Sequence, residues 1–194
     1  LISSLSLSLC LPVSYTTHDT APHSTHAQPR DLDIHKNAYK GHLEDVRADL
    51  LSGVDANTPG AQGRAPLHKA VGGAHEDIVS LLLESGANVE CTDKGGKTPL
   101  HWAALVDASA CATLLLAAGA DLNAVTKNGA SPCHLAAGEN KLEALRLFVE
   151  RGANSDLLNK KGLTPFDLAK SKGHKDAMKI LRPNAGGGCN CVVS

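Results

Sequence analysis

Short apolar stripes at helical spacing, separated by turn residues, run through most of the chain. Leu100, Ala103 and Ala104 fall on one face of a helix. Thr98 and Pro99 precede them. A threonine hydroxyl accepts hydrogen bonds from the free N–H groups of a first helical turn, and proline suits the first helical position because its missing N–H is not needed there. The pattern predicts a short helix that begins at Pro99 and is capped by Thr98.

A second, more apolar helix is predicted from Glu76 to Ser85. Its apolar positions are Ile78, Val79, Leu81, Leu82 and Leu83. Gly86 supplies the left-handed conformation in which helices commonly end. The segment 88–97 then holds a turn cluster made of Asp93, Gly95 and Gly96. Because both helices are short, neither can bury its apolar face alone.

The same pattern returns along the chain at one constant interval. One column of motifs reads APLH at 65–68, TPLH at 98–101, SPCH at 131–134 and TPFD at 164–167. A second column reads GVD at 53–55, GAN at 86–88, GAD at 119–121 and GAN at 152–154. His35 lies one such interval before His68, so a first, degenerate copy begins near residue 31. Self-similarity with this period indicates stacked repeats that share one continuous core.

The TPLH and GAD columns closely resemble the ankyrin repeat over about residues 31–182. The resemblance implies an all-α solenoid of five stacked helix-turn-helix repeats, each with a β-hairpin-like finger that projects at right angles. The repeat domain would span 30–182, in copies 31–63, 64–96, 97–129, 130–162 and 163–182. A disordered leader or targeting remnant at 1–29 would precede it, and a flexible tail at 183–194 would follow it.

Some copies depart from the repeat pattern. The first has Leu32-Asp33 in place of a threonine–proline start, and the last stops at its second helix, as end caps of a stack do. A small residue followed by histidine recurs at Gly41-His42, Ala74-His75 and Gly173-His174. The third copy has Asp107-Ala108 at this place, so we expect its second helix to pack less regularly.

Composition narrows the class of protein. The 194 residues are 42% hydrophobic but only 3% aromatic, so leucine and alanine must supply the core. The formal net charge of −1 argues against a nucleic-acid partner, which would require a clear basic excess. None of the six cysteines forms a CxxC pair, which favours a reducing compartment over a disulfide scaffold.

The sequence offers no convincing catalytic or metal site. Seven of the ten histidines occupy two repeat columns, and residues one full repeat apart in a single column do not converge on one ion. The ankyrin resemblance implies instead that the TPLH histidines brace neighbouring repeats. Gly96-Lys97-Thr98 looks like the end of a phosphate loop, but Cys91 stands where that loop needs its first glycine. Cys133 and His134 are neighbours in sequence, whereas a catalytic cysteine–histidine pair is brought together by the fold. On these grounds together, we expect no enzyme activity, cofactor, metal or small-molecule substrate.

Basic residues recur at the predicted finger tips. The one acid close to them, Asp93, matches a structural turn position. The six cations are Arg64, Lys94, Lys97, Lys127, Lys160 and Lys161. Such a row is either a solvated edge that keeps the protein soluble or a positive ridge that steers an acidic protein partner.

A second surface is predicted where the first helices of the copies end. Leu105 and Val106 are apolar at a place where polar residues are expected, and Trp102 shares their helix face. Tyr39 occupies the corresponding end in the first copy. A tryptophan with aliphatic neighbours in a groove is typical of an interface hot spot. The alternative is that Trp102 packs between the second and third copies, and in both cases we expect it to be partly buried.

The last four residues match a CaaX prenylation box, in which the final serine favours a farnesyl group on Cys191. One isoprenoid gives only marginal membrane attachment. Cys189 is therefore a candidate for palmitoylation, and the basic last helix for contact with anionic lipid. The alternative is an unmodified tail.

Residues 1–29 contain no lysine or arginine and one acid, Asp19. The apolar–serine run from Leu1 to Val13 is either the end of a signal peptide or an organelle transit segment, but secretion conflicts with cytosolic prenylation and a transit peptide should be arginine-rich. We expect a disordered leader or untranslated sequence that has been read through. Because residue 1 is Leu, we also expect a fragment, a processed chain or a conceptual translation.

Together these features predict a non-enzymatic scaffold or adaptor that binds another protein. We expect a cytoplasmic protein held at the cytosolic face of a membrane by C-terminal lipidation. The alternative is a soluble regulatory subunit or inhibitor that occludes a partner enzyme, with its tail unmodified.

Overall fold

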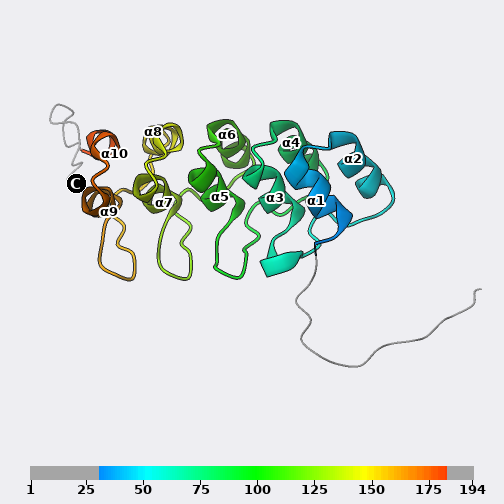
Figure 1. The fold of residues 1–194 in the computed structure, drawn as a ribbon, viewed down its shortest axis with the longest axis horizontal. Coiled ribbons are helices and arrows are strands. Elements are labelled where there is room, and N and C mark those ends of the chain that lie inside the picture. The colour runs from blue at the N-terminus through cyan, green and yellow to red at the C-terminus, as the bar shows by residue number, and fades with distance from the viewer. Residues whose placement is uncertain (1–30, 183–194) are drawn as a thin grey trace, which may run out of the picture.

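The computed structural model describes residues 31–182. Ten short α-helices in this range stack side by side into one elongated body (Figure 1). Residues 31–182 contain no β-strand, so the predicted all-α solenoid is confirmed. Within the same residues, no helix has both the length and the apolar character needed to cross a membrane.

The helices lie in two layers (Figure 1). The inner layer contains α1 (Asp33–Lys40), α3 (Pro66–Gly72), α5 (Pro99–Val106), α7 (Pro132–Gly138) and α9 (Pro165–Lys172). The outer layer contains α2 (Leu43–Leu51), α4 (Glu76–Glu84), α6 (Ser109–Ala117), α8 (Leu142–Glu150) and α10 (Lys175–Leu181). Each helix packs against its partner in the same repeat and against its counterpart in the next. The finger loops extend from the inner layer, and the first of them contains the 3₁₀ turn η1 (Ala61–Gly63).

One apolar core runs between the two layers. Its large, fully buried side chains include Leu67 and Leu100 from inner helices and Leu82, Leu115 and Phe148 from outer helices. Alanines fill many of the remaining buried positions and let the inner helices approach closely. A large buried side chain contributes roughly 1.5–3 kcal/mol on leaving water, so the shared core holds together helices that are too short to be stable alone.

The predicted helix start is confirmed, since α5 begins at Pro99 and Thr98 is its N-cap residue, but the Thr98 hydroxyl makes no cap bond to a backbone N–H. The hydroxyl lies 2.9 Å from Nδ1 of His101, and the same nitrogen accepts the N–H of Thr98 at 3.1 Å. Hydroxyl caps that accept a backbone N–H occur at Ser131 and Thr164.

The TPLH-column histidines brace the stack. Nε2 of His68, His101 and His134 lies 3.0–3.1 Å from the backbone carbonyl oxygen of the first residue of the next repeat. His35 reaches only as far as the carbonyl of Thr58 in its own finger. Because Nδ1 of these rings accepts an N–H, each ring is neutral and donates from Nε2.

The expected irregularity in the third repeat is not observed. Helix α6 is as long as α4 and α8, and it buries Cys111 and Leu115. Asp107 adopts a left-handed conformation at the end of α5, and its Oδ1 accepts the N–H of Ala144 in the next repeat at 2.8 Å. The carboxylate thus supplies an inter-repeat bond in a repeat that has no histidine at this place.

Candidate protein-binding surface

The finger tips are joined by a repeated backbone hydrogen bond. The N–H of Lys94 donates to the carbonyl of Gln62, that of Lys127 to Gly95, and that of Lys160 to Asn128, over 2.9–3.0 Å. Each bond joins one finger to the next. The three lysines are therefore held in one row at equivalent places along the edge of the stack.

The six predicted cations fall into two groups. Lys94, Lys127, Lys160 and Lys161 are exposed on the finger tips. Arg64 and Lys97 are half-buried and lie against Trp102 instead. The exposed edge thus contains four lysines, and the other two cations belong to a cluster on the inner helices.

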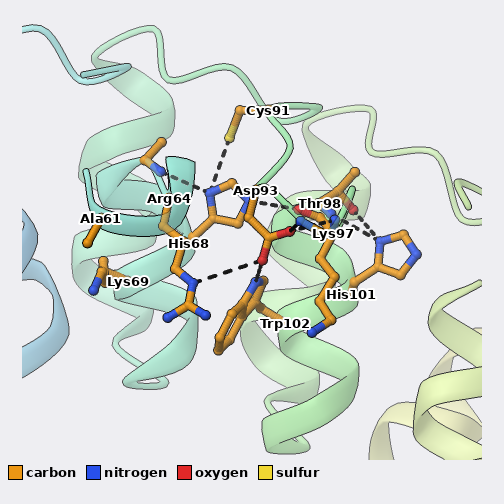
Figure 2. A network of polar contacts seen from close by, with 12 residues as sticks. Ala61, Arg64, His68, Lys69, Cys91, Asp93, Lys97, Thr98, His101 and Trp102 are labelled. Atoms are coloured by element: carbon orange, nitrogen blue, oxygen red, sulfur yellow. Dashed lines mark hydrogen bonds and ion pairs between the residues drawn. The ribbon is translucent and has the colours of Figure 1, made fainter. Parts of the chain in front are cut away.

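Trp102 is the centre of that cluster. The guanidinium carbon of Arg64 is 4.4 Å from the centre of the indole ring, and Nζ of Lys97 is 5.6 Å from it. In Figure 2 the two cations flank the ring. The indole N–H donates to Oδ2 of Asp93 at 3.3 Å. The side chain is half-buried, as expected, and also packs against the core.

Asp93 is the negatively charged residue of this cluster. Its Oδ1 accepts the N–H groups of Gly95 and Lys97 at 2.8 and 2.9 Å, which closes the finger turn. Burial by itself would raise the pKa of Asp93, but these hydrogen bonds and the indole N–H outweigh it and leave the pKa below its ordinary value. Asp93 is therefore an anion, and its Oδ2 lies 3.9 Å from Nε of Arg64.

A cavity of about 240 Å³ opens beside Trp102 on the inner face. It is lined by Tyr39, Arg64, His68, Lys69, Gly72 and Trp102. Tyr39 is 58% exposed. Nζ of Lys69 forms an ion pair with Asp31 at 2.6 Å, so its charge is already balanced.

The structure brings together only some of the predicted site residues. Tyr39, Arg64 and Trp102 share the cavity, and Lys97 lies against the same indole ring. Leu105 is half-buried and Val106 is 36% exposed at the end of α5, and neither lines the cavity. Sequence reasoning did not single out Lys69, although it occupies the same repeat column as Trp102, one copy earlier.

No metal-binding cluster of histidine, cysteine or acidic side chains is present within residues 31–182. Burial raises the pKa of Cys91 and of Cys133 to about 12, so both remain thiols at neutral pH. Nε2 of His134 is directed to the Leu163 carbonyl. The predicted lipidation sites, Cys189 and Cys191, lie outside the described residues.

These features define a helical repeat protein with an inner-helix surface and a row of finger tips. A family model described as Ankyrin repeats (3 copies) matches residues 34–126 and 107–193. The chain therefore belongs to the ankyrin repeat family, and this membership supports a role in protein–protein interaction. A search of curated proteins found no match to the chain.

Proposed function

We propose that this protein is a non-enzymatic scaffold or adaptor that binds another protein through its finger tips and inner helices. The observation that carries the proposal is the backbone ladder that holds Lys94, Lys127 and Lys160 in one row. A fixed row of cations presents one register to an acidic partner, and such complementarity affects the association rate and the register more than the affinity itself.

The charges of the tips favour this use. Lys127, Lys160 and Lys161 form no ion pair with any residue of 31–182, so they are available to a partner. The acid nearest to the row, Asp93, is buried and is used within its own turn.

Charge reversal tests the ridge. Lys127→Glu, Lys160→Glu and Lys161→Glu combined should reduce co-purification of the bound protein from cells at least tenfold. The matched control reverses three exposed arginines on or directly after the outer helices α2 and α8, Arg47, Arg146 and Arg151, and should leave binding within about twofold. Equal losses for both triple variants would show that only the overall charge matters.

We further propose that C-terminal lipidation holds the protein at the cytosolic face of a membrane. The support is the Cys-Val-Val-Ser ending together with Cys189 as a second acylation site. Helix α10 ends at Leu181, and exposed cations lie at Lys175 and at Arg182, the residue that follows the helix. Exposed cations next to an anionic surface add about 1 kcal/mol each to membrane binding.

Membrane fractionation tests the tether. Wild type should sediment with membranes, Cys191→Ser should move to the soluble fraction, and Cys189→Ser should be intermediate because the prenyl group remains. Mass spectrometry of the native C-terminal peptide would show the modification directly. If wild type and Cys191→Ser are equally soluble, the tether is wrong, and the soluble regulatory subunit or inhibitor becomes the better description.

A further inference from the structure

The guanidinium of Arg64 is held in place on two sides. It lies over the ring of Trp102, with 4.4 Å between the guanidinium carbon and the ring centre. Its Nε is buried without a hydrogen bond and faces Oδ2 of Asp93 at 3.9 Å. An arginine fixed in this way loses little conformational entropy when it binds a ligand.

The two terminal nitrogens of Arg64 remain free for such a ligand. They have no hydrogen-bond partner among residues 31–182, and Arg64 lines the cavity of about 240 Å³. In Figure 2 they point away from Asp93. The planar fork of N–H donors is therefore open on the inner face of the stack.

The charged side chains around the cavity leave one positive charge unbalanced. Lys69 is balanced by Asp31, at 2.6 Å, and Asp93 balances one of the two cations that flank Trp102. A single net positive charge suits a monoanion. A phosphate dianion would require a second free cation, and the lysine that lines the cavity is already paired.

We propose that this cavity binds a carboxylate group of an acidic protein partner, a glutamate or aspartate side chain, through a bidentate contact from the terminal nitrogens of Arg64. The fork of an arginine matches the two oxygens of a carboxylate, and such charge-assisted pairs are the stronger hydrogen bonds of proteins. Trp102 is then a positioning residue, since its ring carries Arg64 and its N–H is already bonded to Asp93. Tyr39 provides an exposed ring at the rim for the partner's backbone. The proposal rests on the protein-binding role proposed above and names its anchor.

Calorimetric titration with a hexaglutamate peptide at low ionic strength tests the proposal. Arg64→Lys keeps the charge but removes the fork, and it should weaken binding roughly tenfold. Arg151→Lys makes the same change at an exposed arginine directly after the outer helix α8, away from the cavity, and should leave binding within about twofold. Trp102→Phe keeps a ring beneath Arg64 and should bind more tightly than Trp102→Leu. Circular dichroism melting of each variant shows that the stack is intact.

Three titration results would overturn the proposal: equal binding by wild type and Arg64→Lys, equal losses for Arg64→Lys and Arg151→Lys, or inorganic phosphate displacing the peptide at equimolar concentration. The Trp102 fluorescence gives an independent signal, because it is the one tryptophan of the chain. An unchanged emission on saturation with peptide would also contradict binding in this cavity. These outcomes leave the protein-binding role untouched, because charge reversal of the finger tips tests that role separately.

Discussion

His101 joins the third repeat to the fourth by donating from Nε2 to the carbonyl oxygen of Ala130, 3.1 Å away. Its Nδ1 accepts both the N–H and the hydroxyl of Thr98, so the neutral ring is fully used. A protonated ring would have to give up the bonds at Nδ1. The histidine column thus couples the stability of the stack to pH.

Acidification should destabilise the protein well above the range in which carboxylates titrate. Burial lowers the pKa of His101 to about 4, and burial lowers the pKa of His68 and His134 as well. Since the unfolded chain takes up a proton near pH 6.5, the contribution of His101 is complete above that pH and is lost as pH falls towards 4. The loss from this residue is about 3 kcal/mol. Urea unfolding between pH 7 and pH 4 measures it.

A variant isolates the contribution of the ring. His101→Gln should be less stable than wild type at pH 7 but should lose less stability on acidification, because one titrating group is gone. The account of the brace fails if wild type and His101→Gln show the same dependence of unfolding free energy on pH.

Gly96 lies where two fingers approach each other closely. Its φ is +75°, and a Cβ added there would stand 2.9 Å from the backbone nitrogen of Lys127. Gly96→Ala should cost about 2–3 kcal/mol, which combines the left-handed conformation with the contact to a neighbouring main chain. Gly86→Ala is the control, since φ is +81° there and no atom lies within 4 Å of the added Cβ.

The control should cost only about 1 kcal/mol, the conformational part alone. Equilibrium unfolding in urea compares the two variants. Equal destabilisation would mean that the fingers do not pack as closely as the ladder between them indicates.

Asp93 closes its finger turn with two backbone N–H groups, and the last finger shows what can replace it. There Oδ1 of Asn159 accepts the N–H groups of Lys161 and Leu163 at 2.9 and 3.2 Å. Asp93→Asn should keep the turn but lose the charge beside Arg64 and the acceptor of the Trp102 N–H, at a cost of about 1–2 kcal/mol, and Asp93→Ala should cost about 3 kcal/mol, because it also leaves both turn donors without a partner. Thermal melting of the two variants checks this order, and an Asn variant as unstable as the Ala variant would contradict it.

Most of the fold could be predicted from the repeat period. Motifs such as TPLH recur at a constant interval, so one copy predicts the helices of the others, and the short helices require stacking. The missing cap bond at Thr98 could not be predicted, because Ser131 makes the same contact with its histidine ring and still accepts a backbone N–H, so only the exact placement of the hydroxyl decides. Asp107 escaped prediction because its bond reaches into another repeat.

The candidate surface was less predictable than the fold. Trp102 and Arg64 were both singled out, but on different surfaces, because their contact joins side chains from two repeats. The repeat alignment gives the position of a residue within its repeat, but it does not give the side-chain rotamer that decides which residues of the neighbouring repeat it contacts. The cavity between Tyr39 and Trp102 could not be foreseen, since it depends on Gly72, which leaves space between the two rings.

Two equally exposed valines allow a direct test of whether a partner binds the inner helices or the outer helices. Val106 is 36% exposed at the end of the inner helix α5, and Val149 is 37% exposed on the outer helix α8. A photoreactive benzoylphenylalanine placed at each position in turn reports which face a bound protein covers. The account predicts a specific crosslinked product from position 106 and none from position 149, and crosslinking from position 149 alone would contradict it.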